Sequence, residues 1–392
     1  MSIVIFGDVF TFPEGQAATN RVYTYAKGFK ENGKKVYVIC STSLYLDTPN
    51  GVVDGIPYYH PFEQKKRNKY FLVRRWQNIL KNIRTYRLLK RINKEDKIEA
   101  INRWSNLFLT HMICWVYCKL LRTKLVTECS EHPLGQPLGK YQYSAFGKKM
   151  GIIKFKIEAF FSDGILCISQ YLVNFHTAKG IKANKLFLVP STVDPSRFVR
   201  TGDKPIANPY VGYFGSLSFK RDNVDLLINA FAKFSSHYPQ VQLILGGFCS
   251  ESHKIVMNEL IEQLGINDRV HIIDYLTRQQ VLRYITHADI LVMVRSNDFE
   301  SDASYPSKLT EFLATGNPVI SVKVGEIADF LTDGKNAFLV EPGNVQQLAE
   351  KLKIVFDNYE FAQQVAIKGK ELADTTFNYN YQSKRIIDFI SS

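Results

Sequence analysis

Short apolar runs alternate with amphipathic stretches along most of this chain. Residues 1–7 form one apolar run and residues 35–40 form a second. Between them, residues 20–32 repeat apolar side chains at the three-and-four spacing of one helix face and end before Gly33. A strand, a helix and a strand in this order predict a βαβ unit, whose right-handed crossover requires parallel strands.

The same alternation returns in the second half of the chain. The elements it predicts are strands at 210–214, 241–245 and 270–273, helices at 224–234 and 251–264, and a last helix at 378–390. Repeated strands and helices in both halves are typical of an α/β protein with two parallel sheets.

A further helix is predicted between the apolar strands 288–294 and 318–322. Its buried face is formed by Leu309, Phe312 and Leu313, which recur at helical spacing. The helix therefore links two buried strands, and its first turn lies where the first of those strands ends.

The first turn of this helix carries candidate chemistry. Pro306 suits the start of a helix, because the first helical amides have no partner within the helix. The free amides near Ser307 and Lys308, together with the helix dipole, favour an anion such as a diphosphate. Glu311, one turn further, can accept hydrogen bonds from ribose hydroxyls. These residues predict a site for a sugar nucleotide.

Composition limits the class of protein. The chain has 392 residues, which suits two domains, and 45% of them are hydrophobic. No GxGxxG motif follows the first strand, so a dinucleotide site is not indicated there. The six cysteines are scattered without CxxC spacing, which favours reduced thiols in a cytosolic protein over disulfides or a zinc site.

The stretch 305–320 resembles a segment of the retaining glycosyltransferases of family 4, which have the two-domain GT-B fold. In that family the segment carries the second glutamate of a Glu-x7-Glu motif, and Glu311 falls on it. Ala303 stands at the first position of the motif, with Glu300 and Asp302 nearby. The resemblance leaves open which of these carboxylates, if any, meets the donor sugar.

The resemblance implies an α/β fold with two Rossmann-like doubly wound domains that face each other across a cleft. Residues 1–195 are expected to form the acceptor-side domain, with residues 376–392 crossing back to it. Residues 206–375 are expected to form the domain that binds the nucleotide sugar. The likeness covers the whole second domain, and the first domain only in layout.

Donor contacts are expected after the strand 210–214. Gly215 allows the backbone to approach a ligand, and Ser216 follows it. The family has a Lys or Arg six residues after this glycine, which is Arg221 here, with Lys220 adjacent. Either cation can reach a diphosphate, so the two stay unranked.

The resemblance implies further donor contacts elsewhere. Tyr275 and Leu276 fall in a loop that packs on the nucleotide base in the family, and Gly15 falls in the first loop, where a simple turn glycine is the alternative. The first turn of the motif helix supplies the rest, namely Ser307, Lys308, Leu309 and Glu311.

Titratable side chains follow the predicted strand 125–127. Chemistry in a parallel sheet gathers at the carboxyl ends of strands, and related glycosyltransferases place an acidic residue or a histidine here, beside the donor sugar. Glu128, Glu131 and His132 compete for this position, and decoration of a surface loop is the alternative for each. We expect His132 and Glu131 to act in catalysis together with Glu311.

Residues 65–97 differ from the rest of the chain. They hold thirteen Lys and Arg against two acidic residues, which is +11 of the formal net charge of +13. Aromatic and aliphatic residues, Trp76 among them, are interleaved near helical spacing. This pattern predicts a basic amphipathic helix on an anionic membrane surface. The alternatives are nucleic acid, which we do not expect, and a solvated face of a helix packed on its own sheet.

Two other stretches bear on location. Residues 104–121 are apolar but too short and too often interrupted to span a membrane, so they predict a core helix. Residues 1–7 read as a strand and not as a signal peptide. We therefore expect a cytoplasmic protein associated peripherally with the inner face of the cell membrane.

The resemblance implies a retaining glycosyltransferase that needs no metal or other cofactor. It would move a sugar from a nucleotide diphosphate-sugar to a hydroxyl of a glycan or lipid-linked acceptor, and we expect this step to belong to surface polysaccharide biosynthesis. The alternatives are a nucleotide-sugar epimerase or phosphorylase on the same fold, and a nucleic-acid-binding protein explained by the basic segment.

Overall fold

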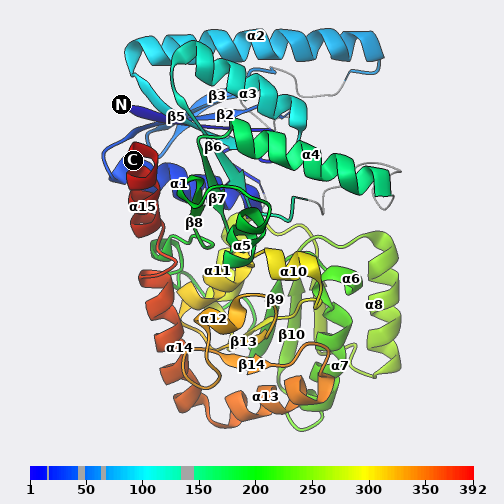
Figure 1. The fold of residues 1–392 in the computed structure, drawn as a ribbon. Coiled ribbons are helices and arrows are strands. Elements are labelled where there is room, and N and C mark those ends of the chain that lie inside the picture. The colour runs from blue at the N-terminus through cyan, green and yellow to red at the C-terminus, as the bar shows by residue number, and fades with distance from the viewer. Residues whose placement is uncertain (16, 43–48, 63–67, 134–144) are drawn as a thin grey trace. The chain divides into compact units, whose positions relative to one another are not determined.

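The computed structural model describes residues 1–392 except 16, 43–48, 63–67 and 134–144, and side chains are described except at 145–148 as well (Figure 1). The chain divides into two compact units. Unit 1 comprises Met1–Thr192 and Tyr379–Ser392, and unit 2 comprises Val193–Asn378. Each unit is a mainly parallel sheet flanked by helices, which confirms the predicted α/β class with two Rossmann-like domains.

The sheet of unit 1 has the strand order β3-β4-β2-β1-β5-β6-β7-β8, parallel except between β3 and β4. Its strands are β1 (Ser2–Gly7), β2 (Lys35–Cys40), β3 (Asn50–Val53), β4 (Ile56–Tyr59), β5 (Ile98–Trp104), β6 (Lys124–Cys129), β7 (Gly164–Cys167) and β8 (Leu186–Leu188). The helices of this unit are α1 (Ala17–Glu31), α2 (Phe71–Glu95), α3 (Phe108–Leu121), α4 (Ala145–Phe161), α5 (Gln170–Ala178) and α15 (Tyr379–Ser391), with a 3-10 turn at Ala183–Lys185.

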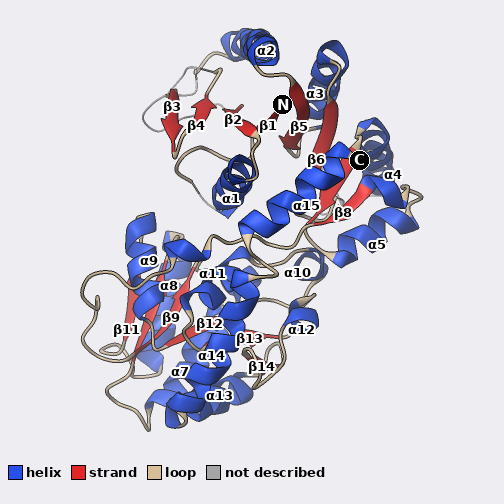
Figure 2. Ribbon diagram, turned by 90° about the vertical axis from the view of Figure 1, so that its left-hand side faces the viewer, coloured by secondary structure: helices blue, strands red, loops and turns tan. Residues whose placement is uncertain are grey.

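The buried strand β1 shows how the two faces of this sheet are covered. Its odd residues Ile3 and Ile5 join a core cluster with α1 and α15, while Val4 and Phe6 join a second cluster with α2 and α3. Because side chains alternate along a strand, an apolar run buried on both faces needs helices on both sides. Figure 2 shows α1 and α2 on the two sides of this sheet.

The C-terminal helix α15 belongs to unit 1 and packs on α1. A Cβ added at Gly28 of α1 would overlap the Ser383 hydroxyl, so glycine permits this close approach. The Tyr379 hydroxyl donates to Glu31 at 2.7–2.8 Å. The last residues of the chain thus complete the fold of the first unit.

The sheet of unit 2 is parallel, with the order β11-β10-β9-β12-β13-β14. Its strands are β9 (Tyr210–Phe214), β10 (Gln242–Gly246), β11 (Val270–Ile273), β12 (Ile290–Met293), β13 (Val319–Val322) and β14 (Phe338–Val340). Its helices are α6 (Phe219–Asp222), α7 (Val224–Ser235), α8 (Glu251–Gln263), α9 (Arg278–His287), α10 (Phe299–Ala303), α11 (Ser307–Thr315), α12 (Ile327–Phe330), α13 (Val345–Asp357) and α14 (Tyr359–Asp374), with a 3-10 turn at Pro195–Arg197.

One predicted boundary is wrong. Trp104 does not begin a helix, because it ends the central strand β5, and the helix that follows begins at Phe108. The strand escaped prediction because it carries Asn102 and Arg103, which are polar yet buried. Asn102 is held in the core by the Trp104 indole, which donates to its side-chain oxygen at 2.6 Å.

Helix α2 covers most of the basic segment, of which residues 65–67 lie outside the described part. Its second half anchors it to the sheet through Leu89 and Ile92. Its first half exposes large apolar side chains, including Leu72 (78% exposed) and Trp76 (61%). Within the described ranges, no helix is long and apolar enough to cross a membrane.

Candidate functional site

Two glycines shape the carboxyl edge of the sheet in unit 2. A Cβ added at Gly247, after β10, would overlap the carbonyl oxygen of Gly215, after β9. A Cβ added at Gly215 would overlap the ammonium of Lys308. Glycine at both positions therefore lets the two strand ends close on each other and on the first turn of α11. Two predicted site residues, Gly215 and Lys308, are brought together here.

Lys308 is held in place by neighbours from β9 and α6. Its Nζ donates to the Tyr213 hydroxyl at 2.7 Å and lies 3.1 Å from Asp222 Oδ1. Burial lowers the pKa of Lys308, and the charge of Asp222 opposes that shift. Pro306 precedes the helix without a side-chain cap, so the amides of its first turn, Ser307 included, are not satisfied by a capping side chain.

Two arginines extend this positive charge. Arg295, just after β12, is 6% exposed and donates from Nη2 to the Ser304 hydroxyl at 2.7 Å. Burial lowers the pKa of Arg295, and the charge of Arg221 lowers it further. Arg221 also lowers the pKa of Lys308. Arg221, Arg295 and Lys308, called the cation cluster below, thus lie close enough to repel one another, and the carboxylates of Asp222 and Asp298 offset part of their charge.

The cation cluster helps to rank Lys220 and Arg221, which the sequence left unranked. Lys220 and Arg221 both lie in the exposed one-turn helix α6. The Arg221 carbonyl accepts from the Ser296 amide at 2.9 Å, which ties α6 to the loop after β12. Because the charge of Arg221 contributes, after burial, to lowering the pKa of both other cluster members, it is the better candidate for an anion ligand. Ser216 is exposed, and its carbonyl accepts from Tyr213.

Glu311 forms a two-point ion pair. Its two carboxylate oxygens accept from Arg278 at 2.8 and 3.0 Å, and the guanidinium of Arg278 lies 5.8 Å from the centre of the Phe198 ring. Each carboxylate oxygen has a second lone pair for a hydroxyl donor. The pair fixes the direction of the carboxylate expected to bind ribose.

The side chains near the expected base contact form an apolar corner. Tyr275 has φ of +51° and is 79% exposed, and its ring meets that of Phe248 edge-on at 6.3 Å. A Cβ added at Gly246 would lie 2.8 Å from Leu276, so Leu276 packs against the end of β10. An exposed aromatic pair beside a half-buried leucine offers a flat surface of the kind on which a base stacks.

Two residues of the motif segment, Leu309 and Ala303, have buried side chains. The Leu309 side chain is buried in the core, and its amide donates to the Pro306 carbonyl at 3.0 Å. Leu309 therefore supports the site from beneath. Ala303 is buried at the end of α10, whereas Glu300 is exposed and Asp302 half-buried, so these carboxylates remain the candidates for the missing first glutamate.

In unit 1, Glu128 lies near the end of β6, where its side chain is buried and forms an ion pair. Arg21 Nε lies 3.0 Å from Glu128, and the same guanidinium donates to the carbonyls of Pro190 and Val189, both at 2.8 Å. Burial raises the pKa of Glu128 to about 7, and Arg21 opposes the shift. This ion pair joins α1, β6 and the segment after β8, which is a structural role that sequence alone did not indicate.

The other two candidates in this loop differ in exposure. Glu131 is exposed, and its carbonyl accepts from the Cys129 thiol at 3.6 Å. His132 is buried with its ring 4.7 Å from that of Phe175, and burial lowers its pKa, so the imidazole is neutral at pH 7. A neutral histidine can donate a hydrogen bond to a sugar hydroxyl or accept one from it.

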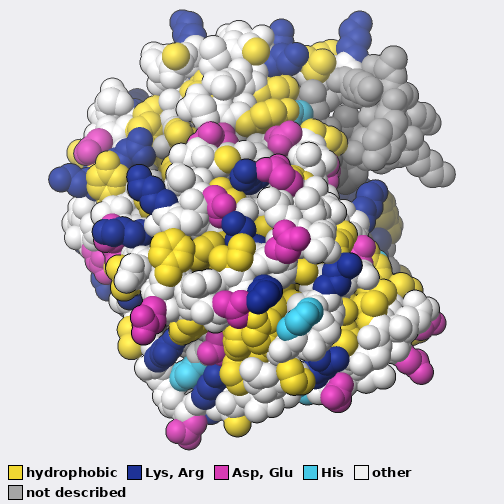
Figure 3. Space-filling model, turned by 90° about the horizontal axis from the view of Figure 1, so that it is seen from below, with side chains coloured by type: hydrophobic (Ala, Val, Ile, Leu, Met, Phe, Trp, Pro, Cys, Tyr) yellow, Lys and Arg dark blue, Asp and Glu magenta, His cyan; other side chains and the backbone are white. Residues whose placement is uncertain are grey.

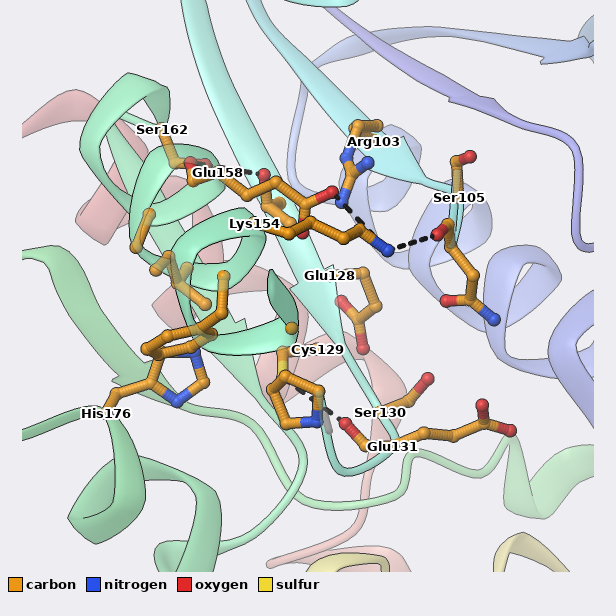
Figure 4. A pocket seen from close by; sticks show the side chains of 17 residues that line it. Arg103, Ser105, Glu128, Cys129, Ser130, Glu131, Lys154, Glu158, Ser162 and His176 are labelled. Carbon is orange, nitrogen blue, oxygen red and sulfur yellow. Dashed lines mark hydrogen bonds and ion pairs between the residues drawn. The ribbon is translucent and has the colours of Figure 1, made fainter. Parts of the chain in front are cut away.

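A small polar pocket of about 70 Å³ lies behind this loop. Figure 4 shows Arg103 and Lys154 converging on it with Glu158, above Glu128. Lys154 donates to the Asn106 carbonyl at 2.9 Å, while Nε and Nη1 of Arg103 have no hydrogen-bond partner within the described part of the chain. The pocket is too small for a sugar ring, so it does not form the main site.

Gly15 is explained by its own loop. A Cβ added there would overlap the Thr19 hydroxyl, which donates to the Thr11 carbonyl at 2.7 Å. Its predicted donor contact stays a prediction. Among the residues that the structure describes, no three or more His, Cys, Asp or Glu side chains are grouped to hold a metal ion.

Sequence reasoning missed Arg278 and Arg295. Each occupies a position that could have drawn attention to it. Arg295 comes directly after the apolar strand, and Arg278 begins the helix after the loop expected to pack on the base. Their partners lie 33 and 9 residues away in the chain, so no local pattern pairs them.

Comparison with known proteins agrees with this architecture. The family model described as Glycosyltransferase Family 4 matches residues 18–197, and that described as Glycosyl transferases group 1 matches residues 200–372. An uncharacterized glycosyltransferase of Methanocaldococcus jannaschii is 26% identical over 223 residues, 56% of this chain and 57% of its own length. A D-inositol 3-phosphate glycosyltransferase of Corynebacterium urealyticum is 26% identical over 153 residues, 38% of this chain.

The chain spans 57% and 35% of the lengths of these two curated relatives. Solved structures match over nearly the full length. Anabaena HepE in complex with UDP-glucose is 16% identical over the whole of both chains, with a TM-score of 0.68. A sucrose-phosphate synthase from Thermosynechococcus elongatus is 15% identical over 99% of this chain and 98% of its own, with a TM-score of 0.74.

Two Rossmann-like units in one chain, one with cations gathered at the carboxyl ends of its strands, define a protein of the GT-B fold. The two family models together cover most of the sequence. The chain belongs to the glycosyltransferases of the group 1 and family 4 type.

Proposed function

We propose that this protein transfers a sugar from a nucleotide diphosphate-sugar to a hydroxyl of a glycan or lipid-linked acceptor, with retention of configuration and without a metal. The observation that carries the proposal is the cation cluster of Arg221, Arg295 and Lys308 beside the uncapped start of α11. Three cations beside two carboxylates, Asp222 and Asp298, leave positive charge unbalanced, and a diphosphate supplies the missing negative charge.

The cluster also suits the chemistry of transfer. As the bond between sugar and diphosphate breaks, negative charge grows on the leaving oxygen. Charges that are already fixed in place stabilise it without reorganising, because Lys308 is held by Tyr213 and Asp222 and Arg295 by Ser304. A site of this kind needs no metal to neutralise the leaving group.

The rest of the donor is assigned to neighbouring residues. The nucleotide base stacks near Tyr275 and Leu276, and the ribose hydroxyls meet Glu311, oriented by Arg278. In unit 1, the neutral His132 and the exposed Glu131 are assigned to the sugar end of the reaction. A UDP-sugar is the first donor to test, because the similar HepE structure is a complex with UDP-glucose.

The first half of α2 supports a peripheral membrane location on the cytoplasmic side. Its exposed apolar strip, Phe71, Leu72 and Trp76, is 57%, 78% and 61% exposed and lies among Arg and Lys side chains. Apolar side chains can enter the headgroup region while the cations meet anionic lipid. By contrast, the face seen in Figure 3 intersperses Lys and Arg with Asp and Glu. A lipid-linked acceptor in surface polysaccharide assembly suits this location.

Product analysis tests the proposal. The protein is incubated with a panel of nucleotide sugars, with and without membrane-derived acceptors, and the products are identified by mass spectrometry and by NMR of the anomeric proton. We expect nucleoside diphosphate release that depends on acceptor, and a product with the anomeric configuration of the donor. Conversion of the nucleotide sugar without acceptor would indicate an epimerase, and an inverted product would contradict retention.

A further inference from the structure

A second hollow in unit 1 is not used by the reaction as described so far. This groove, of about 570 Å³, lies along the first half of α2. Asp8, Ser41 and Asn106 line it from the segments that follow β1, β2 and β5. The groove therefore opens at the carboxyl ends of three parallel strands, which is where open α/β sheets bind ligands.

Cations line the groove from the helix side. They are Arg74, Arg75 and Lys81, and Asp8 is the only acidic residue among the described residues that line it. The Asp8 carboxylate already accepts from the Thr110 hydroxyl at 3.0 Å. The groove thus carries an excess of positive charge.

Two of these cations are anchored by neutral backbone atoms. Lys81 Nζ donates to the Ser41 carbonyl at 3.1 Å, and Arg74 Nη1 donates to the carbonyls of Asn68 and Lys69 at 3.1 and 2.8 Å. Burial lowers the pKa of Lys81, with Asp8 opposing the shift. A carbonyl orients a cation without cancelling its charge, so both remain ready for an anion.

The apolar strip begins where this positive groove ends. Phe71 lines the groove and lies under Arg75, whose guanidinium is 4.9 Å from the ring centre. Leu72 and Trp76 continue outward on the same helix and are 78% and 61% exposed. The same helix thus carries the cations that line the groove and, next to them, the exposed apolar strip.

We infer that this groove is the acceptor subsite and that the acceptor is an amphiphile bearing a phosphate or diphosphate. Its anionic group lies between Arg74, Arg75 and Lys81, and its hydrocarbon chain follows the apolar strip towards the membrane. This inference rests on the proposed glycosyltransferase function, which it deepens by naming the chemical class of the acceptor. A neutral glycan would leave the three cations of the groove with Asp8 as the one counter-charge among the described residues that line it.

Three soluble probes separate the contributions. Dodecyl phosphate, dodecyl glucoside and inorganic phosphate are titrated into the full-length protein below their aggregation concentrations, with binding followed by calorimetry. UDP is present at saturation, so that the cation cluster of unit 2 is occupied. We expect dodecyl phosphate to bind at least tenfold more tightly than either of the other two, since only it fills both parts of the groove.

A matched pair of variants locates the binding. Arg74→Gln with Lys81→Met removes two charges from the groove while keeping an unbranched stem at each position. Arg87→Gln with Arg91→Gln removes two exposed charges from the second half of the same helix. We expect the first variant to lose dodecyl phosphate binding at least tenfold and the second to keep it within about twofold. Thermal stabilisation of each variant by UDP reports that the fold is intact.

Three outcomes would overturn the inference. Equal binding of dodecyl phosphate and dodecyl glucoside would exclude an anion subsite. Equal binding of inorganic phosphate would indicate free phosphate as the ligand and exclude an amphiphile. Unchanged binding in the Arg74 and Lys81 variant would place the anion elsewhere. If instead no nucleotide or nucleotide sugar stabilises the native protein, the proposed function fails, whatever the alkyl phosphate does.

Discussion

The molecule presents positive charge in two ways, in the cation cluster of unit 2 and along the first half of α2 in unit 1. In the cluster, Arg295 is buried and Lys308 half-buried, and each is held by a hydroxyl from another element. On α2, Arg74 and Arg75 lie at the surface, beside exposed apolar side chains. The same residue types therefore stand in two different environments.

The difference predicts different uses. Fixed charges in a desolvated site act strongly on one ligand geometry and are screened little by salt. Exposed charges act on a surface, each contributes about 1 kcal/mol near anionic lipid, and salt screens them. From this comparison we expect the cation cluster of unit 2 to bind the donor phosphates and α2 to contact the membrane surface.

The largest expected effect separates Arg221 from Lys220. Arg221→Met removes a member of the cation cluster and should lower kcat/KM about 100- to 1000-fold, the range for a lost electrostatic donor. Lys220→Met, one residue earlier on the same exposed turn, should change kcat/KM less than about threefold. Steady-state kinetics with saturating acceptor measures both. An equal loss of kcat/KM in the two variants would contradict the assignment of Arg221, rather than Lys220, to the donor diphosphate.

The next effect concerns Glu311. Glu311→Ala removes the expected ribose acceptor and frees Arg278, so we expect the donor KM to rise about tenfold or more while the melting temperature changes little. Glu300→Ala and Asp302→Ala in parallel test which carboxylate replaces the missing first glutamate. Unchanged kinetics in Glu311→Ala would contradict its assignment to the donor.

The sequence allowed much of the fold to be predicted, because periodicity reports burial. The βα alternation, the helix α11 and the C-terminal helix follow from apolar spacing. Strand β5 did not, since Asn102 and Arg103 give a central strand a polar appearance. Apolar periodicity cannot reveal a buried polar residue whose partner is supplied by the fold.

The candidate site divides in the same way. Gly215 and Lys308 could be proposed from local motifs, and they lie together. Arg278 and Arg295 could not, because their importance comes from partners that only the folded chain brings near. Glu128 was a candidate for chemistry, yet its ion pair with Arg21 depends on a contact 107 residues apart.

A smaller effect is expected from salt. Raising NaCl from 0.05 to 0.5 M should weaken binding to vesicles that contain anionic lipid about tenfold, because exposed cations are screened. The donor KM should change less than about threefold, since Arg295 is buried and Lys308 half-buried. Co-sedimentation and kinetics in the same buffers make the comparison. Equal salt dependence of the two would remove the distinction between the regions.

The smallest expected effect tests the apolar strip. Trp76→Ser should weaken vesicle binding about three- to tenfold by removing one aromatic side chain from the interface. Tyr381→Ser is the matched control, because Tyr381 is a comparably exposed aromatic on α15 (54%). Equal effects of the two substitutions would show that α2 is not a special surface.

The most direct test of the central claim is equilibrium binding of nucleotide sugars by calorimetry. The account predicts that at least one nucleotide diphosphate-sugar, with a UDP-sugar tested first, binds the native protein. It further predicts that joint replacement of Arg221 and Arg295 by Met weakens that binding at least tenfold while Lys220→Met does not. Binding that survives the loss of both arginines unchanged would contradict the account.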